Sequence, residues 1–353
     1  MMARLWNGLP IAALLVQVAL APCVGAQRTP LRSPWDSHVA TMTDTPWSCP
    51  ALPRLPHDFA TNSYYIDRHH SVIDPELKKR YQDSVAPIEG FSRDAVTAAD
   101  RYWTGGSRSA AECATALLAG AAAQKALTGS MDGHQASYVQ GWNLGSWAVA
   151  WLKVRSSRVA SPAQAAEISV WLGKLAEENR GYYEKKRRQN STDSANNHLY
   201  WAGFAISAAA IATDDRELFE WGMDAYRHGV RDIQDDGTLP MEMDRGQMAL
   251  HYHLYALAPL VLLAEFGEVN GLDLYAESDY AIRRLVARCI GGLRDPAWFE
   301  RRTGVRQVTT PQIEAWEIGW AQPWLRRFPD PAISELLPEA SRLNYTTWGG
   351  LPP

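Results

Sequence analysis

The sequence predicts an all-α protein, and three observations lead to this prediction. Apolar residues recur with helical spacing over most of the chain. Residues that start and stop helices separate these stretches, while signals for strands are weak and scattered. The order of long helix, short polar break and long helix then repeats. Such a chain of helical hairpins forms a bundle, a superhelix or a closed α/α toroid, and the periodicity leaves all three open.

The expected helices have recognisable ends. Residues 161–164 (Ser-Pro-Ala-Gln) form a capping box with proline at the first helical position. Residues 214–217 (Asp-Asp-Arg-Glu) offer an N-cap acceptor followed by a glutamate. Gly129 and the Asn-Gly pair at 270–271 indicate helix ends. We therefore expect helices over residues 93–104, 108–128, 134–155, 162–183, 193–212, 215–233, 243–268 and 276–292.

The N-terminus is typical of a secretory signal peptide. Arg4 precedes an apolar run over residues 9–21, and small residues follow up to Ala26. The run is too short for a membrane-spanning helix. We expect cleavage after Ala26 and a periplasmic or secreted mature protein without a membrane span. Lipid attachment at Cys23 is the alternative, although Pro22 fits that signal poorly.

Composition divides the rest of the chain. Residues 28–56 contain six prolines, so residues 27–56 are expected to form an extended arm. Residues 57–327 would form the main helical domain, and residues 328–353 a tail that packs on it.

The formal net charge of -4 argues against non-specific binding of nucleic acid. Three cysteines, Cys49, Cys113 and Cys289, remain after cleavage, so at most one intrachain disulfide forms.

A first polar cluster interrupts an apolar helical pattern at residues 196–201 (Asn-Asn-His-Leu-Tyr-Trp). On a helix, Asn197 and His198 share a face with Trp201. Buried polar groups are costly unless they form hydrogen bonds. A structural hydrogen-bond network and a functional site explain this segment equally well.

A second cluster occupies the start of the helix expected over residues 243–268. Arg245, Tyr252 and Tyr255 are spaced so that they fall on one stripe of a helix. Leu250 and Leu254 begin a separate apolar stripe that we assign to the core. The polar stripe is either part of a site or an aromatic packing edge with an arginine above it.

Together the two clusters resemble polysaccharide lyase family 5, the alginate lyases. The resemblance rests on Asn197-His198-x-x-Trp201, Arg245 and His251-Tyr252-His253. Weaker similarity extends it over residues 64–307. The resemblance implies an incomplete α/α toroid with an N-terminal lid segment, no metal and no cofactor. It also implies a disulfide between Cys49 and Cys113, which leaves Cys289 free.

The family also implies roles for individual residues. Asn197 and Arg245 would neutralise the uronate carboxylate, His198 would assist as a base or carboxylate ligand, and Tyr252 would act as base and acid. Around them, the residues expected to bind substrate are Trp201, Tyr255, His251, Trp142, Tyr65 and Arg68. Helix packing for Trp142 and a solvated loop for Arg68 are alternative interpretations.

These residue types suit β-elimination. The C5 proton of a uronate becomes more acidic once donors such as Asn and Arg neutralise the adjacent carboxylate. A base then removes this proton while an acid protonates the departing glycosidic oxygen. In mannuronate both events occur on one face of the ring, so Tyr252 alone suffices if Arg245 lowers its pKa. In guluronate the events occur on opposite faces, and His198 and Tyr252 would divide them.

The sequence therefore predicts a monomeric lyase that binds an anionic polysaccharide, with poly-mannuronate as the substrate towards which the family leans. A broader polyuronate or glucuronate lyase is the first alternative. A glycoside hydrolase would need two carboxylates across a groove, for which Glu242 and Asp244 are available. A non-catalytic polysaccharide-binding protein of the periplasm is a further alternative. His251 and His253 are two residues apart on a helix and point in different directions, so a metal site is not expected.

Overall fold

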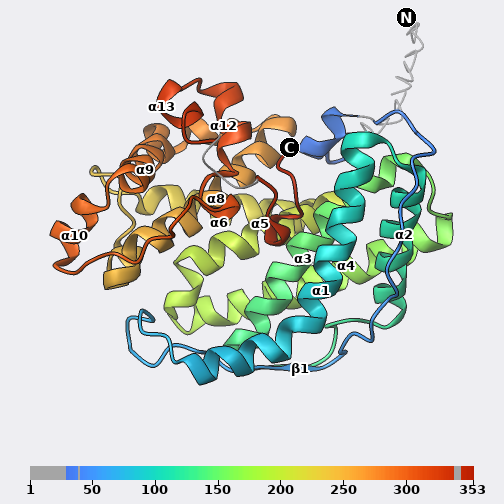
Figure 1. Ribbon diagram of the computed structural model, residues 1–353, viewed down its shortest axis with the longest axis horizontal. Helices are drawn as coiled ribbons and strands as arrows, with labels where there is room; N and C mark the ends of the chain where they lie inside the picture. Colours follow the sequence, from blue (N-terminus) through green and yellow to red (C-terminus); the bar gives the residue numbers. More distant parts are fainter. Residues whose placement is uncertain (1–28, 39, 338–342) are drawn as a thin grey trace, which may run out of the picture. The chain divides into compact units, whose positions relative to one another are not determined.

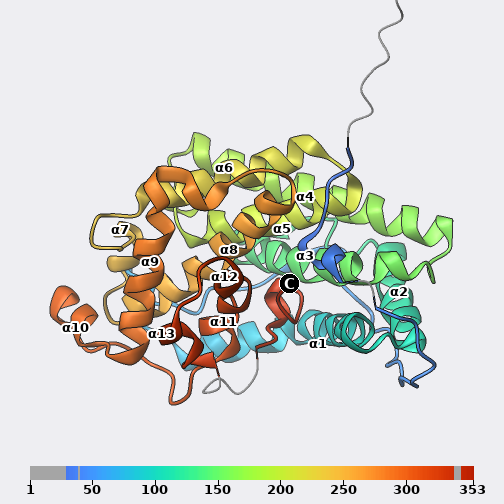
Figure 2. The same cartoon turned by 90° about the horizontal axis from the view of Figure 1, so that it is seen from above.

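A computed structural model describes residues 29–38, 40–337 and 343–353. The expected signal peptide, residues 1–26, lies outside the described residues. Leu31–Pro353 forms one compact unit, shown in two views in Figures 1 and 2. Its helices are α1 (Pro75–Gly105), α2 (Arg108–Ala123), α3 (Gly133–Val154), α4 (Pro162–Arg188), α5 (Asn197–Thr213), α6 (Arg216–Asp232), α7 (Pro240–Met243), α8 (Ala249–Val269), α9 (Glu277–Arg294), α10 (Ala297–Thr303), α11 (Ala315–Ile318), α12 (Ala321–Arg327) and α13 (Pro331–Ser334).

The prediction of an all-α protein is confirmed. Two short strands, β1 (Phe59–Ala60) and β2 (Met131–Asp132), pair in parallel and join the N-terminal arm to the start of α3. Each of the eight expected helical ranges falls on one of the long helices. The capping box at residues 161–164 is present at the start of α4, and Asp215 caps α6 by accepting from the backbone N–H of Leu218.

Two helix starts lie more than four residues from the predicted position. The first helix begins at Pro75 rather than at residue 93, because Asp74 caps it and proline occupies its first turn; the helix then continues through Pro87. The helix expected from residue 243 begins at Ala249 instead. The chain before Ala249 forms the single turn α7 and a 3-10 turn, and Gly246, the first residue of that 3-10 turn, has a positive φ of 54°.

The long helices form two rows. α1, α3, α5 and α8 pack against one another in succession, and α2, α4, α6 and α9 pack behind them. Figure 2 shows α4 and α6 on one side of α3 and α5, with α1 on the other. Almost every residue of α3, α5 and α8 is buried, whereas α4 and α6 bury one face each. The inner row therefore supplies most of the core.

One stretch of the described chain, Gly246–Val269, is long and apolar enough to cross a membrane. In this fold 89% of its most apolar window is buried among the other helices. The apolar composition of this stretch is therefore explained by its position as the central helix of the core.

The N-terminal arm and the C-terminal segment of the described chain are both attached to the helices. The expected disulfide between Cys49 and Cys113 is present and ties the N-terminal arm to α2, and Cys289 is free and buried. At the other end, Trp348 is fully buried. The Lys153 side chain of α3 donates to the backbone oxygens of Gly349 and Leu351. This fixes residues 345–351 beside α3.

Candidate active site

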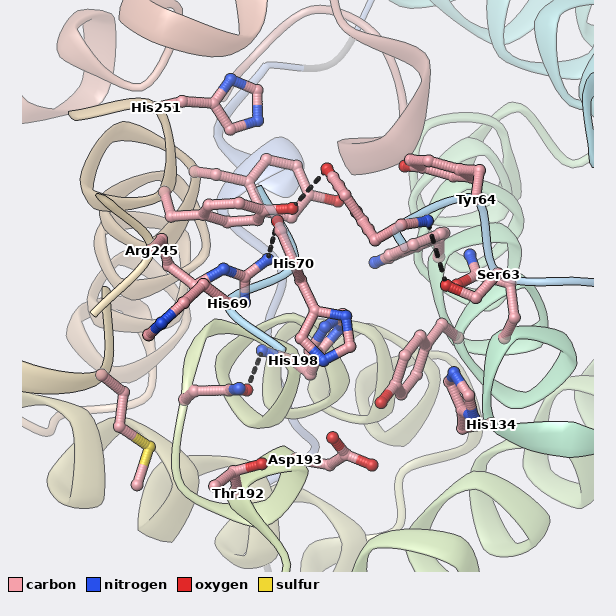
Figure 3. Close-up of a pocket in the computed structure, with 18 of the residues that line it drawn as sticks. Ser63, Tyr64, His69, His70, His134, Thr192, Asp193, His198, Arg245 and His251 are labelled. Atoms are coloured by element: carbon pink, nitrogen blue, oxygen red, sulfur yellow. Dashed lines mark hydrogen bonds between the residues drawn. The ribbon is translucent and has the colours of Figure 1, made fainter. Parts of the chain in front are cut away.

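A pocket of about 620 Å³ opens at one end of the inner helices. Figure 3 shows Arg245, His70 and His198 around its centre, His251 at one side, and Thr192 and Asp193 at the opposite side. α3, α5 and α8 contribute side chains to its wall, and so do the loop before α1 and the C-terminal segment. The pocket therefore brings together residues that are up to 284 positions apart, from Ser63 to Thr347.

The loop before α1 covers this pocket. The Tyr65 hydroxyl lies 2.6 Å from the Tyr252 hydroxyl. The His69 ring contacts the backbone oxygen of Asp244 at 2.8 Å, and the Gln247 side chain donates to the Ser71 oxygen at 2.8 Å. These three contacts hold the segment that corresponds to the expected lid against the start of α8.

Arg245 and Tyr252 lie together, although for a reason other than the one expected. Arg245 belongs to the irregular turn before α8, so the helical stripe predicted from the spacing does not exist at this position. The turn instead places the guanidinium carbon 3.6 Å from the centre of the Tyr252 ring. This is a close cation–π contact, and both side chains are buried.

The pKa of Tyr252 does not meet the condition under which Tyr252 alone would suffice, namely a value lowered by Arg245. Burial raises the pKa to about 12, and the Arg245 charge and the Tyr65 hydrogen bond oppose this rise without cancelling it. Tyr252 in this closed pocket is therefore a neutral phenol at neutral pH.

His198 lies in the first turn of α5 and stacks on Tyr138 of α3, with ring centres 3.9 Å apart. Burial lowers the pKa of His198 to about 3, and the Arg245 charge acts in the same direction, while Asp193 opposes it. The ring is therefore neutral, and its Nδ1 atom has no hydrogen-bond partner among the described residues. A neutral imidazole with a free nitrogen is able to accept a proton or bind a polar ligand.

Asn197 lies beneath the pocket wall and is fully buried. Its backbone N–H and its side-chain amide both donate to Oε1 of Glu242, each at 2.9 Å. Burial raises the pKa of Glu242, while the nearby Arg245 charge lowers it. The second carboxylate oxygen of Glu242 has no partner in the described part of the chain. This contact joins the two clusters recognised in the sequence.

The expected substrate-binding residues divide into two groups. Those that line the pocket are Tyr65, Arg68, Trp142, His251 and Tyr255. Trp201 does not line it. Its indole N–H donates to the backbone oxygen of Tyr255 at 3.0 Å, and its ring packs against the Tyr255 ring. The structure thus places Trp201 one layer behind the wall.

Other lining residues were not expected from the sequence. Tyr64, Trp316 and Tyr345 add aromatic surface, and Asp193 forms an ion pair with Lys186 at 3.2 Å at one end of the pocket. Tyr345 belongs to the C-terminal segment, where nothing in the local sequence indicates a site. The sequence offers a signal near one of them, because Lys186, the partner of Asp193, lies in the basic run Lys185–Arg188, and such a run can form the edge of a groove for a polyanion.

No group of three or more His, Cys, Asp or Glu side chains that could hold a metal ion occurs among residues 29–38, 40–337 and 343–353. His253, which the sequence places near the motif, is fully buried outside the pocket. Its Nε2 accepts from the Leu239 backbone N–H at 2.9 Å, and its Nδ1 contacts the Ala249 oxygen at 2.7 Å. The side chain is a structural link between α7 and α8.

Comparison with solved structures identifies the class of fold. The chain is similar to alginate lyase A1-III in complex with a tetrasaccharide, with a TM-score of 0.77 and 23% identity over 92% of this chain and 89% of that chain. It is also similar to alginate lyase A1-III from Sphingomonas species A1, with a TM-score of 0.73 and 23% identity over 91% of this chain and 89% of the other. The fold is an incomplete α/α toroid of helical hairpins.

Sequence comparison identifies the family. The family model described as alginate lyase matches residues 58–299. A polysaccharide lyase of Stenotrophomonas maltophilia is 41% identical over 81% of this chain and 84% of its own length. An alginate lyase of Pseudomonas putida strain F1 is 31% identical over 78% of this chain and 76% of its own length. The chain belongs to the alginate lyase family.

Proposed function

We propose that the protein depolymerises alginate by β-elimination, with poly-mannuronate as its preferred substrate. The observation that carries this proposal is the Arg245 guanidinium stacked on Tyr252 in a pocket that also contains His198. The pair provides a fixed positive charge beside a phenol that can transfer protons. Membership of the alginate lyase family supports the same chemistry.

Neutralisation of the substrate carboxylate is the first task of the site. The Arg245 side chain has an Nε–H without a partner among the described residues, and the one hydrogen bond that it donates to them is a long one, 3.4 Å, to the His70 oxygen. An arginine in this state binds a carboxylate through charge-assisted hydrogen bonds. With Asn197 as the second donor, it would stabilise the negative charge that grows on the carboxylate as the C5 proton leaves.

Proton transfer is the second task. Neutral Tyr252 can donate its proton to the departing glycosidic oxygen, and neutral His198 can accept a proton. On mannuronate, Tyr252 would do both steps on one face, which requires its phenolate form. Because burial holds the pKa of Tyr252 at about 12, turnover of mannuronate should rise as the pH is raised above neutral.

The remaining expectations are part of the same proposal. Residues 1–26 would direct export to the periplasm or the medium, and the mature chain would act as a monomer without a cofactor. Residues 57–327 would form the lyase domain, with the arm before it and the tail after it packed on its helices. Broader action on glucuronate polymers is the first alternative.

The hydrolase alternative is less favoured by the geometry. It needs two carboxylates that face the substrate across a groove. Asp244 lines the pocket, but Glu242 is buried beneath it and accepts two hydrogen bonds from Asn197. Glu242 is therefore not placed to act on a glycosidic bond.

The test is the ultraviolet absorbance of the unsaturated uronate product. Purified protein with a chelator is mixed separately with polymannuronate, polyguluronate and polyglucuronate. The proposal predicts a rising signal that is fastest on polymannuronate. A folded protein that gives no signal on any polymer would contradict it, and reducing-end and binding assays would then distinguish a hydrolase from a binding protein.

A further inference from the structure

Glu242 is a buried carboxylate for which the proposed reaction has no direct use. It lies on the single turn α7, and only 1% of its surface is exposed. A buried carboxylate is costly unless hydrogen bonds and nearby charges compensate it. The contacts of Glu242 therefore indicate what it does.

One contact fixes the start of α5. Asn197 is the first residue of α5, and its backbone N–H has no partner within the helix. Oε1 of Glu242 accepts this N–H and also the side-chain amide of the same residue. The helix N-terminus is positive, so a carboxylate there is stabilised electrostatically. The same turn carries His198, so Glu242 holds two proposed site residues at once.

The second carboxylate oxygen of Glu242, unlike the first, accepts no hydrogen bond from the described residues. Oε2 of Glu242, Oδ1 of Asn197 and Nε of Arg245 are all buried and without partners in the described residues. Arg245 follows Glu242 by three residues, and its charge acts on the Glu242 carboxyl. Buried polar atoms without a hydrogen-bond partner are unusual in folded proteins, and here three of them occur in one cluster.

We propose that Glu242 is a positioning residue of the lyase site, which holds the Asn197 amide and the first turn of α5 in place beside Arg245 so that both donors can bind the uronate carboxylate. This inference rests on the proposed function. Glu242 does not touch the substrate and acts through Asn197. The important feature is the position of its acceptor oxygen rather than its charge.

Two conservative variants separate position from charge. Glu242→Gln keeps an acceptor at the Oε1 position and removes the charge, whereas Glu242→Asp keeps the charge and withdraws the acceptor by one methylene. We expect Glu242→Asp to lower kcat about 100-fold, the scale for loss of one donor to a developing oxyanion, with little change in KM. We expect Glu242→Gln to lower kcat no more than about fivefold, since the hydrogen bonds persist.

A matched control shows what the same substitution does at a buried glutamate outside the pocket. Glu265 on α8 is also buried and accepts a hydrogen bond from the Tyr275 hydroxyl at 2.7 Å, away from the pocket. Glu265→Asp should change thermal stability and leave kcat unaltered. All rates are expressed per folded protein, as measured by circular dichroism.

A double-mutant cycle provides the decisive readout, because a merely structural role would not produce its pattern. If Glu242 acts through Asn197, the double variant Glu242→Asp/Asn197→Ala should have about the kcat of Asn197→Ala alone. The inference would be wrong if the two substitutions lowered kcat independently, so that their effects multiplied in the double variant. It would also be wrong if Glu242→Asp kept the kcat of wild type, or if Glu242→Gln lowered kcat more than Glu242→Asp does. An inactive wild-type protein would instead overturn the proposed function, and the inference with it.

Discussion

The buried charged cluster around Lys153 and the one around Arg245 differ in how completely their hydrogen bonds are formed. In the first, the Lys153 ammonium donates to Asp100 and to two backbone oxygens, and the other Asp100 oxygen accepts from the Leu351 N–H. In the second, around Asn197 and Arg245, four buried atoms have no partner within the part of the chain that the structure describes: Asn197 Oδ1, His198 Nδ1, Glu242 Oε2 and Arg245 Nε. The first cluster is complete without a ligand, whereas the second has unused donors and acceptors.

The difference separates structural polar groups from functional ones. A satisfied cluster of this kind fixes one arrangement of the chain, here residues 345–351 against α3. In the second cluster, His198 and Arg245 line the pocket, and a ligand bound there explains their unpartnered nitrogen atoms. Variants in the first cluster should therefore act mainly on stability, and variants in the second mainly on turnover.

The largest effect is expected at Tyr252. Tyr252→Phe removes the hydroxyl that transfers protons and should abolish measurable turnover, because acid–base catalysis contributes about 10²–10⁴-fold. The variant should still fold and bind polymer, as measured by circular dichroism and titration calorimetry. Full activity in this variant would refute the role given to Tyr252.

The structural cluster should respond in the opposite way. Lys153→Met leaves the Asp100 carboxylate buried without its cation and should lower the free energy of unfolding by about 3–5 kcal/mol. Urea unfolding of wild type and variant measures this loss. The double variant Lys153→Met/Asp100→Leu should recover part of it, and a single variant as stable as wild type would show that the comparison is wrong.

Arg245 should affect turnover more than stability. Arg245→Ala removes the carboxylate donor and should lower kcat about 100-fold, while the free energy of unfolding falls by about 1 kcal/mol or less. Arg288 is a matched control, since its guanidinium also stacks on an aromatic ring, Trp298, at 3.5 Å outside the pocket. An equal loss of kcat in Arg245→Ala and Arg288→Ala would contradict a specific role for Arg245.

The smallest effect is a dependence of stability on pH. Burial lowers the pKa of His253 to about 4, below the ordinary value of 6.5. Below pH 6.5 the unfolded chain therefore binds a proton that the folded chain does not, and stability falls as the pH falls towards 4. His253 alone should contribute a loss of about 2 kcal/mol between pH 7 and pH 5. Denaturant unfolding at the two pH values should show a smaller difference in His253→Gln than in wild type; an unchanged difference would exclude His253 as the source.

Much of the fold follows from local patterns. All eight expected ranges fall on helices, because apolar residues recur along each of them with helical spacing. The start of α1 was missed because Pro87 interrupts its pattern. The predicted start of α8 is too early, because the spacing of residues in the sequence does not indicate the turn at Gly246.

The site was less predictable, because it depends on contacts between distant residues. Tyr252, His198 and Arg245 were expected in one site and lie in one pocket. Trp201 shares a helix with His198, yet Tyr255 covers it. The bond between Glu242 and Asn197 joins residues 45 positions apart, and Tyr345 reaches the pocket only through the packing of the C-terminal segment. No local pattern contains such information.

The central claim is that Arg245, whose Nε–H has no partner among the described residues, binds a uronate carboxylate. The most direct measurement is calorimetric binding of a mannuronate oligomer and its carboxyl-reduced counterpart to the Tyr252→Phe variant, in which no cleavage interferes. We expect the carboxyl-reduced oligomer to bind at least about tenfold more weakly, the scale of one charge-assisted hydrogen bond, and Arg245→Ala in the same background to remove the difference. Equal binding of the two oligomers would contradict the account.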